Sequence, residues 1–461
     1  MQQRNAPNTA PVETPAEPVA ESAARQAGAQ RVVICGGGAG GLPLAIMLAH
    51  RNRRRGLSIT LADPSPTHVW KPLLHEFASG SADPSAHETA YFALARWHGF
   101  TFAQGALEGI DRDKRYVLIG PTRDETGVEL APARRLPYDR LVIAVGGVTN
   151  DFGVKGVKDY AFALDSAADA ECLHRRIVQA CMRANYGLGE ISDQRLDICI
   201  VGGGATGVEL AAELRATTRE LIAYGLDRLD PERFIRISLV NADPRLLLQL
   251  PERISTSVET VLRDLNVDVR NGQQVTEVTP DHVVMRSGEQ RQSDITIWAA
   301  GVKAPAFLAG LGGLATNRMD QIEVTPTLLA SGDPHIFAMG DCASAPWLGK
   351  TTRIPPRAQA AYQQARYLSR ALPRSLRGEE LAPFGYNDLG SLVSLGGESA
   401  VGTLMGWARG AGIRIEGLLA QLIYRGLYKQ HQAVLFGWWA VFLDSIGGWF
   451  RGATRPHVKL H

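Results

Sequence analysis

The 461-residue chain lacks long apolar runs, a strong net charge and any basic segment interleaved with aromatic residues. A membrane-spanning helix needs about 18 or more apolar residues in a row, and the longest run, 433–443, ends at Asp444, so we expect no transmembrane helix. The formal net charge of +2 gives no reason to expect nucleic acid as a partner. The first 30 residues hold no continuous apolar core, so no signal peptide is expected.

Cysteine is scarce, and its spacing argues against metal binding. The five cysteines are an odd number, and none of their spacings matches a zinc or iron–sulfur site, so we expect no metal. Reduced thiols in a cytosolic compartment are the simplest interpretation. Cys35 and Cys199 lie in predicted buried strands, where they are expected to act as small core residues.

Glycine, by contrast, is abundant. The 48 glycines fit a fold with many tight turns and close approaches between backbone and ligand, and the length allows two or three domains. Residues 1–29 are rich in Ala, Pro and Glu and cannot bury enough apolar surface to offset the entropy of ordering. We predict that they form a disordered tail.

The first motif is a glycine-rich turn between a short β-branched strand, 31–35, and a helical pattern. Gly36, Gly38 and Gly41 have the GxGxxG spacing, in which the first glycine permits the turn, the second lets a pyrophosphate approach and the third lets helix and strand pack. The following helix directs its N–H groups at the phosphates. A second strand ends at Asp63, where a carboxylate can bind ribose hydroxyls. This unit is predicted to bind a dinucleotide.

The same unit recurs about 165 residues later, which indicates one unit per ligand rather than a solenoid. Gly202, Gly204 and Gly207 follow a predicted strand and precede a predicted helix. The next strand ends at Asn241 instead of an acid. Asn241 can hydrogen-bond a ribose hydroxyl, but it lacks the negative charge that would repel a 2′-phosphate, so NADH and NADPH both remain open as donors.

A third motif, Gly340-Asp341, ends another predicted strand. A carboxylate in that position can bind a polyol such as the ribityl chain of FAD. Alone, the pair could equally be an ordinary turn. Together with two GxGxxG units, it favours a flavin.

These stretches resemble the two-dinucleotide flavoprotein superfamily of the disulfide reductases and, within it, the type II NADH dehydrogenases, which are NADH:quinone oxidoreductases that pump no protons. The resemblance covers about residues 30–461 and is strongest to the respiratory enzyme of proteobacteria. It rests on the stretches 36–41, 68–76, 144–147, 201–214, 298–305, 339–343 and 355–363 and on the basic C-terminal region.

The resemblance implies an α/β fold class with two Rossmann-like nucleotide-binding domains and C-terminal amphipathic membrane-docking helices. The FAD domain is then split in sequence, with the NAD domain inserted into it. The expected divisions are a tail over 1–29, FAD domain over 30–160, NAD(P)H domain over 161–305, second part of the FAD domain over 306–382 and membrane-associated region over 383–461.

It also implies roles for individual residues. Glu209 matches a glutamate near the stacked nicotinamide and flavin, and Gln359 falls in a motif at the quinone end of the flavin, so both are expected to take part in catalysis. A structural role for either remains open. The expected cofactor-binding residues are Gly36, Gly38, Gly41, Asp63, Lys71, Gly146, Gly202, Gly204, Gly207, Asn241, Gly301, Gly340, Asp341 and Ala358.

The absence of a cysteine pair distinguishes this chain from the related disulfide reductases. Those enzymes need two cysteines about four residues apart beside the flavin, and no such pair follows Gly41. Sulfide:quinone oxidoreductases also need cysteines on the flavin side. Electrons are therefore expected to pass directly from the flavin to an external acceptor.

Residues 412–461 are expected to be helical and rich in aromatic residues. Apolar residues of 417–432 share one helical face, and Trp438, Trp439 and later aromatics and cations follow. Such a segment suits the surface of an anionic membrane, although a packed hairpin or a homodimer interface fits as well.

We therefore expect a respiratory enzyme that transfers hydride from NADH to non-covalent FAD and then two electrons to a membrane quinone. It would lie peripherally on the cytoplasmic face of the bacterial inner membrane. A soluble NAD(P)H-dependent flavin reductase for a protein acceptor such as ferredoxin is the alternative. That function would not account for the amphipathic C-terminal segment, 412–461. A flavin-bound sensor would not need both glycine motifs intact.

Overall fold

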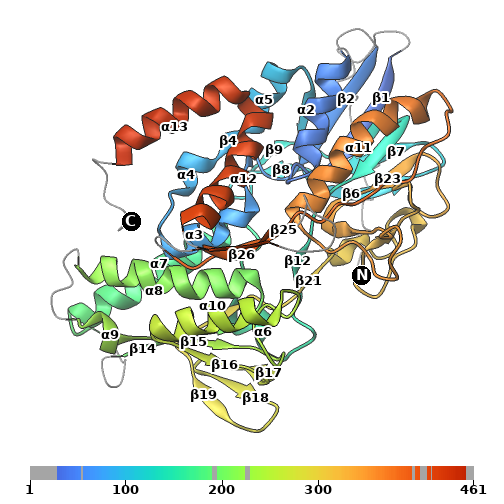
Figure 1. Cartoon of the computed structure of the whole chain (residues 1–461). Helices are drawn as coiled ribbons and strands as arrows, with labels where there is room; N and C mark the ends of the chain where they lie inside the picture. The colour runs from blue at the N-terminus through green and yellow to red at the C-terminus, as the bar shows by residue number, and fades with distance from the viewer. Residues whose placement is uncertain are drawn as a thin grey trace, which may run out of the picture.

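Two parallel β-sheets, each covered by helices, form the body of the molecule (Figure 1). The computed structural model describes residues 29–52, 56–188, 195–223, 229–396, 400–404, 413–416 and 418–452. The predicted disordered tail, 1–29, lies outside these residues except for its last position.

The first sheet combines strands from distant parts of the chain in the order β23-β11-β1-β2-β5, and every pair is parallel. Its strands are mostly buried apolar residues, as expected for a parallel sheet with helices on both faces. The strands are β1 (Gln30–Cys35), β2 (Leu57–Asp63), β5 (Thr101–Gln104), β11 (Arg140–Ile143) and β23 (Ile336–Ala338), and helices α2 (Gly41–Asn52), α5 (Tyr91–His98) and α11 (Ala358–Leu376) belong to this part.

The second sheet has the order β13-β20-β14-β15-β16 and is also parallel throughout. It lies in sequence between β11 and β23, so the first sheet is split around it, as the resemblance implied. Its strands are β13 (Ala161–Phe162), β14 (Leu196–Val201), β15 (Ile235–Val240), β16 (Val267–Arg270) and β20 (Ile295–Trp298), with helices α6 (Val157–Tyr160), α7 (Ala167–Asn185), α8 (Ala205–Ala223), α9 (Pro231–Phe234) and α10 (Glu252–Asp264).

Short strands and helices complete the two units. Two of these strands, β12 (Val148–Thr149) and β21 (Val302–Lys303), pair across the junction where the chain enters and leaves the second unit. The other strands and α-helices of the two units are β3 (Thr67–His68), β4 (Thr89–Ala90), β6 (Leu107–Asp111), β7 (Tyr116–Ile119), β8 (Thr122–Arg123), β9 (Glu129–Ala131), β10 (Arg134–Pro137), β17 (Val275–Val278), β18 (His282–Met285), β19 (Gln290–Gln292), β22 (Ile322–Glu323), β24 (Ala343–Ser344), α3 (Leu74–Ser79) and α4 (Pro84–His87).

The C-terminal part is a three-stranded antiparallel sheet followed by two helices. The strands are β25 (Gly390–Ser394), β26 (Ala400–Leu404) and β27 (Ile413–Glu416), and the helices are α12 (Leu418–Phe436) and α13 (Trp438–Gly452). The expectation that helix begins at 412 is wrong, because Ile413–Glu416 alternates apolar and charged residues and pairs with β26. Within the described part of the chain, none of the helices has the length and apolarity needed to cross a membrane.

Candidate active site

The first glycine loop joins β1 to α2 and shows why glycine stands at each motif position. Gly36 has φ +106°, and a Cβ there would collide with the carbonyl of Ala144, the residue after β11. A Cβ on Gly41 would collide with the Gly36 carbonyl. A Cβ on Gly38 would meet no atom within 4 Å. The first and third glycines therefore close the turn, and the second faces open space where a phosphate can approach.

Asp63 lies beside this loop, at the end of β2 where the sequence placed it. Its Oδ2 accepts a hydrogen bond of 2.6 Å from the Gly37 N–H, and its Oδ1 accepts one of 2.9 Å from the Ser65 N–H. Burial raises the pKa of Asp63, while these N–H groups and the charge of Lys71 act in the opposite direction. The carboxylate therefore fixes the loop as well as offering oxygen atoms to a ligand.

Two side chains that the sequence analysis did not single out as ligands also hold this loop. The Gly37 carbonyl accepts a 2.9 Å hydrogen bond from the Tyr91 hydroxyl and lies 3.0 Å from His68 Nδ1. His68 Nε2 lies 2.9 Å from His431 Nε2 of α12, and the His431 ring stacks on Trp70 at 4.0 Å between centroids. Burial lowers the pKa of His68 to about 4. The loop is thus linked to the C-terminal helices.

The Gly340-Asp341 turn meets Lys71 and the Ala144–Gly147 segment. Lys71 Nζ donates a 3.3 Å hydrogen bond to the Gly147 carbonyl, and a Cβ on Gly147 would lie 3.1 Å from Asp341 Cβ. Burial raises the pKa of Asp341, and the charge of Lys71 opposes that shift. Gly146 and Gly340 both have positive φ, of +76° and +75°. Four of the predicted cofactor-binding positions are therefore gathered in one place.

The first turn of α11 lies against the same place. Helix α11 begins at Ala358, and a Cβ on Gly340 would lie 3.6 Å from the Cβ of Ala361 one turn later. The amide of Gln359 donates a 2.9 Å hydrogen bond to the Gly390 carbonyl and accepts one of 3.2 Å from the Leu389 N–H. Gln359 therefore has a structural role, because it ties α11 to β25.

The second glycine loop, between β14 and α8, repeats the arrangement of the first. Gly202 has φ +123° and no room for a Cβ beside Ala299, and a Cβ on Gly207 would collide with the Gly202 carbonyl. Gly204, like Gly38, faces open space. Both loops thus fit a dinucleotide pyrophosphate, because the glycine that approaches the ligand is the one without a neighbour.

Asn241 follows β15 and lies beside this loop. Its Nδ2 donates hydrogen bonds to the carbonyls of Asp243 and Arg245, at 3.2 and 3.0 Å, and to Asn271 Oδ1 at 3.1 Å. A Cβ on Gly203 would come within 2.5 Å of Asn241 Cγ. The amide therefore stabilises the turn after β15, which an aspartate could not do with the same bonds.

Glu209 lies in the second turn of α8 and connects three parts of the fold. Its Oε1 accepts a 3.1 Å hydrogen bond from the Ser394 N–H of β25, and its Oε2 lies 3.7 Å from His75 Nδ1 of α3. Burial lowers the pKa of His75 to about 4, so the ring is neutral at pH 7. His75 therefore lies beside the predicted catalytic glutamate as a neutral ring.

Gly301 lies at the junction of the two sheets. Its φ is +69°, and its carbonyl accepts a 3.2 Å hydrogen bond from the Asn150 N–H where β12 and β21 pair. A Cβ on Gly301 would come within 2.5 Å of the exposed Phe152 ring. Gly301 therefore shapes the crossing between the two nucleotide-binding units.

No redox-active disulfide or metal cluster is found among the described residues. All five cysteines are free thiols, and no group of three metal-ligating side chains comes together in the described ranges. Burial raises the pKa of four of these thiols, Cys35, Cys181, Cys199 and Cys342, to about 12. Buried thiols of this kind are unreactive.

Comparison with known proteins agrees with this geometry. The family model for pyridine nucleotide-disulphide oxidoreductases matches residues 30–365. The chain is 37% identical to the type II NADH:quinone oxidoreductase of Haemophilus influenzae over 94% of this chain and 100% of that protein. It is 28% identical to the type II NADH:quinone oxidoreductase NdhA of Mycobacterium tuberculosis, over 91% and 89% of the two chains.

The fold is also shared with solved structures. NDH2 from Plasmodium falciparum in complex with NADH superposes with a TM-score of 0.75 at 20% identity, covering 93% of this chain and 100% of that one. The sulfide:quinone oxidoreductase of Aquifex aeolicus superposes with a TM-score of 0.68 at 21% identity, covering 89% and 92%.

Proposed function

Because the chain belongs to the pyridine nucleotide-disulphide oxidoreductase family and is a type II NADH:quinone oxidoreductase, a respiratory enzyme, we propose how its own residues carry the reaction. Its substrates are NADH and quinone. The proposal has three parts, which are the residues that hold FAD, the residues that hold the donor and the surface that meets the membrane.

The FAD is held non-covalently, one per chain, by the first sheet. Gly36, Gly38 and Gly41 receive its pyrophosphate, and Asp63 and Asp341 offer carboxylate oxygens to its hydroxyl groups. The half-buried position of Asp341 near the charge of Lys71 supports this role, because a polyol replaces water without leaving the carboxylate unpaired. When bound, FAD supplies the chemistry of accepting a hydride and releasing two electrons.

NADH is held by Gly202, Gly204 and Gly207, with Asn241 beside the ribose. Glu209, in the second turn of α8, orients the nicotinamide or relays a proton, and His75 positions the glutamate from 3.7 Å away. Both groups are buried, so water does not compete for them. NADPH remains a second donor in this proposal, because Asn241 carries no charge to repel a 2′-phosphate.

The quinone approaches the first turn of α11. Ala358 and Gln359 lie there, beside Gly340, and the Gln359 amide has donors and acceptors suited to a quinone carbonyl. Its hydrogen bonds to Leu389 and Gly390 must then be shared with the quinone. The chain's predicted divisions at 160, 305 and 382 belong to the same proposal, since they place α11 in the FAD domain.

Helices α12 and α13 dock the enzyme on a membrane surface. Figure 1 shows α13 lying along an outer edge of the molecule. Its exposed side chains are large and apolar: Trp438 is 69% exposed, Trp439 80% and Phe442 55%. Trp97 of α5, 66% exposed, adds to this surface through its ring contact with Phe436. Aromatic residues gathered in this way suit a lipid interface.

Most side chains of the predicted apolar stripe over 417–432 lie outside the described residues. The cations Arg455 and Lys459 lie outside them as well. A homodimer that shares this aromatic surface is compatible with the same exposure. The location that we propose is peripheral, on the cytoplasmic face of the bacterial inner membrane.

The observation that carries the proposal is the repeated glycine loop with open space at Gly38 and again at Gly204. The test is NADH oxidation by the purified protein with a quinone and, separately, with a ferredoxin as acceptor. Quinone-dependent oxidation supports the proposal. Oxidation that depends only on ferredoxin would favour the soluble reductase instead.

A further inference from the structure

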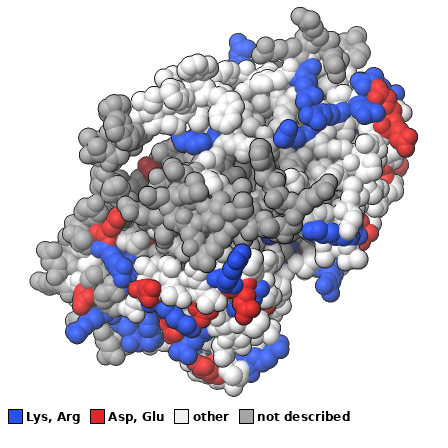
Figure 2. Space-filling view, in the orientation of Figure 1, with Lys and Arg blue, Asp and Glu red and all other residues white. Residues whose placement is uncertain are grey.

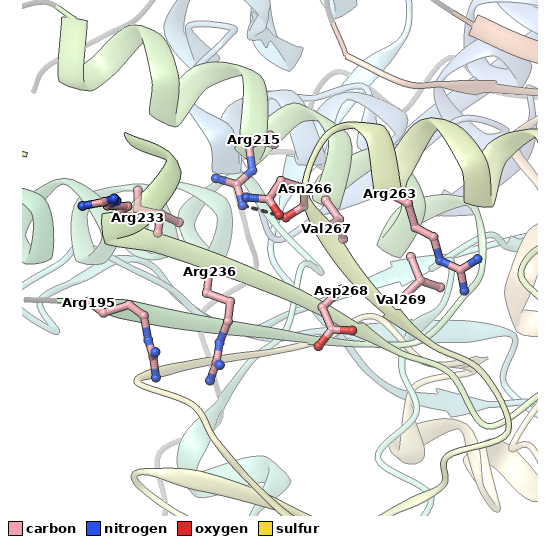
Figure 3. A pocket seen from close by; sticks show the side chains of 10 residues that line it. Arg195, Arg215, Arg233, Arg236, Arg263, Asn266, Val267, Asp268 and Val269 are labelled. Atoms are coloured by element: carbon pink, nitrogen blue, oxygen red, sulfur yellow. Dashed lines mark hydrogen bonds between the residues drawn. The ribbon is translucent and has the colours of Figure 1, made fainter. Parts of the chain in front are cut away.

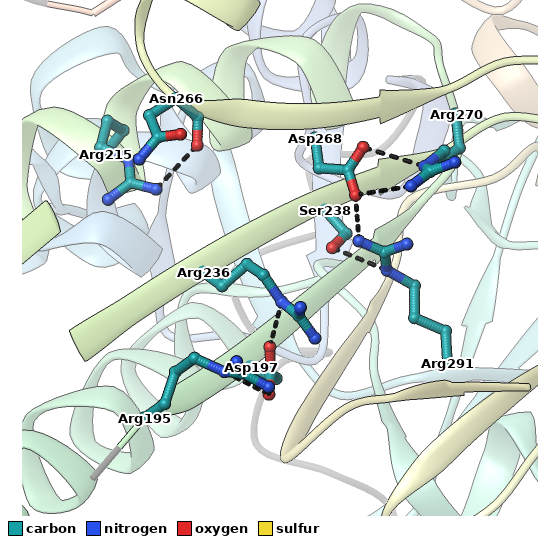
Figure 4. A network of polar contacts seen from close by, with 9 residues as sticks. All are labelled: Arg195, Asp197, Arg215, Arg236, Ser238, Asn266, Asp268, Arg270 and Arg291. Carbon is teal, nitrogen blue, oxygen red and sulfur yellow. Dashed lines mark hydrogen bonds and ion pairs between the residues drawn. The ribbon is translucent and has the colours of Figure 1, made fainter. Parts of the chain in front are cut away.

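The two ends of the second sheet differ in the side chains that they present. Charged residues of both signs gather over the lower part of the molecule (Figure 2), and a cavity of about 390 Å³ at the sheet's amino-terminal end is lined largely by arginines (Figure 3). Acids of the protein pair with most of these arginines, as Asp197 does with Arg195 and Arg236 (Figure 4). The charges there are engaged with one another, whereas the carboxyl-terminal end presents an exposed aromatic ring, Phe152.

Phe152 is unusual both in its exposure and in its backbone conformation. It is 62% exposed although its side chain is a large apolar ring, and its φ is +50°. A bulky residue with positive φ is a conformational outlier, because its Cβ atom crowds the backbone. Such strain persists only where the surroundings impose it, and strained residues are concentrated at functional sites.

The residues on either side hold Phe152 in this conformation. The side-chain oxygen of Asn150 accepts a 3.0 Å hydrogen bond from the Phe152 N–H. The Asp151 carboxylate accepts a 3.2 Å hydrogen bond from the Gly153 N–H and pairs with Lys303 at 3.3 Å. The turn is therefore fixed before any ligand binds, and a ring that is already in place loses little entropy on binding.

The Phe152 ring lies on Gly301, which follows β20 at the carboxyl-terminal end of the second sheet. A Cβ on Gly301 would come within 2.5 Å of the Cζ atom of the ring. The second glycine loop is adjacent, because a Cβ on Gly202 would lie 2.6 Å from the carbonyl oxygen of Ala299. Phe152 therefore stands beside the donor loop, at the end of the sheet where open parallel sheets bind their ligands.

The order of the strands indicates which half of the donor comes near this ring. Strands β20 and β15 lie on opposite sides of β14. A dinucleotide lies across the carboxyl ends of such a sheet where the strand order reverses, and its adenosine ribose is bound at the end of the unit's second strand. Asn241, which follows β15, therefore marks the adenosine side, and Gly301, which follows β20, marks the nicotinamide side.

We propose that Phe152 packs against the nicotinamide riboside of the donor and so holds it in place for hydride transfer. The inference rests on the proposed function, and it adds an aromatic contact to a donor site so far built from glycines, Asn241 and Glu209. Aromatic rings attract one another in offset or edge-to-face contacts, and the bound donor would also cover apolar surface of Phe152 that now faces water. Phe152 itself exchanges no proton or electron.

The test is anaerobic stopped-flow reduction of the FAD-loaded enzyme over a range of NADH concentrations, which yields the Kd for NADH. The variant is Phe152→Asn, because asparagine tolerates positive φ better than most residues do and removes the ring. Phe152→Tyr keeps the ring and should behave as the wild type does. The control is Tyr186→Asn, which removes an aromatic side chain of nearly the same exposure, 64%, from the end of α7.

We expect the Kd for NADH to rise roughly tenfold in Phe152→Asn and to stay unchanged in Phe152→Tyr and Tyr186→Asn. ADP carries the adenosine and the pyrophosphate but no nicotinamide, so its inhibition constant should be the same in all of these proteins. Reoxidation of the reduced flavin by a short-chain quinone should not change either, since Phe152 is placed at the donor.

An unchanged Kd for NADH in Phe152→Asn would overturn the inference. An equal loss of affinity for ADP would overturn it as well, because the variant would then disturb the whole donor site rather than the nicotinamide half. If NADH fails to reduce the flavin of the wild type, the proposed function is wrong and the inference falls with it. If NADH reduces the wild type and binds the variant equally well, only the inference is wrong.

Discussion

At the scale of single residues, the two glycine loops separate positions that close a turn from positions that admit a ligand. Gly36 and Gly202 have positive φ and no room for a side chain, so substitution there strains the fold. A Cβ on Gly38 or Gly204 meets no other atom within 4 Å. A side chain at either should therefore leave the fold intact and block a cofactor.

Replacement of Gly204 by valine should weaken NADH use and leave FAD in place. The valine side chain would fill the space that the donor pyrophosphate needs. The resulting loss of binding free energy should raise the KM for NADH roughly ten- to a hundredfold. Steady-state kinetics and the flavin absorption spectrum measure the two effects. Gly38→Val is the matched variant and should lose FAD instead. Loss of flavin from Gly204→Val would contradict the assignment of the two loops.

Asn241 should control the choice between NADH and NADPH. Asn241→Asp places a negative charge near the ribose, and repulsion of a 2′-phosphate should raise the preference for NADH roughly tenfold or more. The bonds from Asn241 Nδ2 to Asp243 and Arg245 are lost with either donor, so the ratio of kcat/KM values is the proper readout. An unchanged ratio would show that Asn241 does not face the donor ribose.

His68 and His75 should make the fold less stable in acid. Burial lowers the pKa of both to about 4, below the value of about 6.5 in an unfolded chain. The unfolded chain therefore binds more protons between these values. The free energy of unfolding is fully retained above pH 6.5 and falls as the pH drops toward 4, by roughly 3 kcal/mol for each histidine.

Chemical unfolding at pH 7.5 and at pH 5 checks this dependence. His68→Gln/His75→Gln should lose less stability between the two pH values than the wild type does. His282→Gln, on the β18 hairpin, is the control and should keep the slope of the wild type. Equal slopes in all three proteins would show that neither histidine is responsible.

At the scale of elements, α13 is the part of the C-terminal region that can be altered without opening the core. Truncation near residue 412 would remove His431 and Leu435, which are buried, and with them the contact that reaches Gly37 through His68. A truncated protein could therefore lose FAD for a reason unrelated to membranes. Substitutions on the exposed face of α13 avoid this problem.

Replacement of Trp438, Trp439 and Phe442 by serine should release the enzyme from membranes. Each aromatic side chain contributes roughly 1–3 kcal/mol when it leaves water, so the triple variant should bind vesicles at least about a hundredfold more weakly. Co-sedimentation with anionic vesicles measures the loss, and activity with a water-soluble quinone should not change. The control is Phe152→Ser, an exposed aromatic far from α13 in the sequence. Undiminished vesicle binding would contradict the docking role.

The elements differ in how well the sequence specified them. Strand Ile235–Val240 and the helix after Gly41 follow from hydrophobic pattern and motif alone, because both are long and buried. Strand Ile413–Glu416 was missed, because four alternating residues next to a long helical pattern carry little signal. The hydrogen bonds of Tyr91 and His68 to Gly37 were also missed, since they join residues that only the folded chain brings together.

At the scale of the whole molecule, the sequence specified the nucleotide-binding loops better than it specified the contacts between distant elements. The split first sheet and inserted second sheet agree with the family resemblance, and both glycine loops lie where it placed them. The cavity lined by Arg195, Arg215, Arg233, Arg236 and Arg263 could not be foreseen, because these residues come from separate parts of the chain between residues 195 and 263. The contact between His75 and Glu209 likewise depends on how α3 packs beside α8.

The measurement that tests the central claim most directly is oxidation of NADH by the purified protein, followed at 340 nm with and without a short-chain quinone. We expect a yellow protein whose flavin is reduced by NADH and whose NADH consumption depends on the quinone. If NADH fails to reduce the flavin, the second glycine loop is not a donor site. If the flavin is reduced but quinone does not accelerate NADH loss, direct transfer from the flavin to quinone is contradicted.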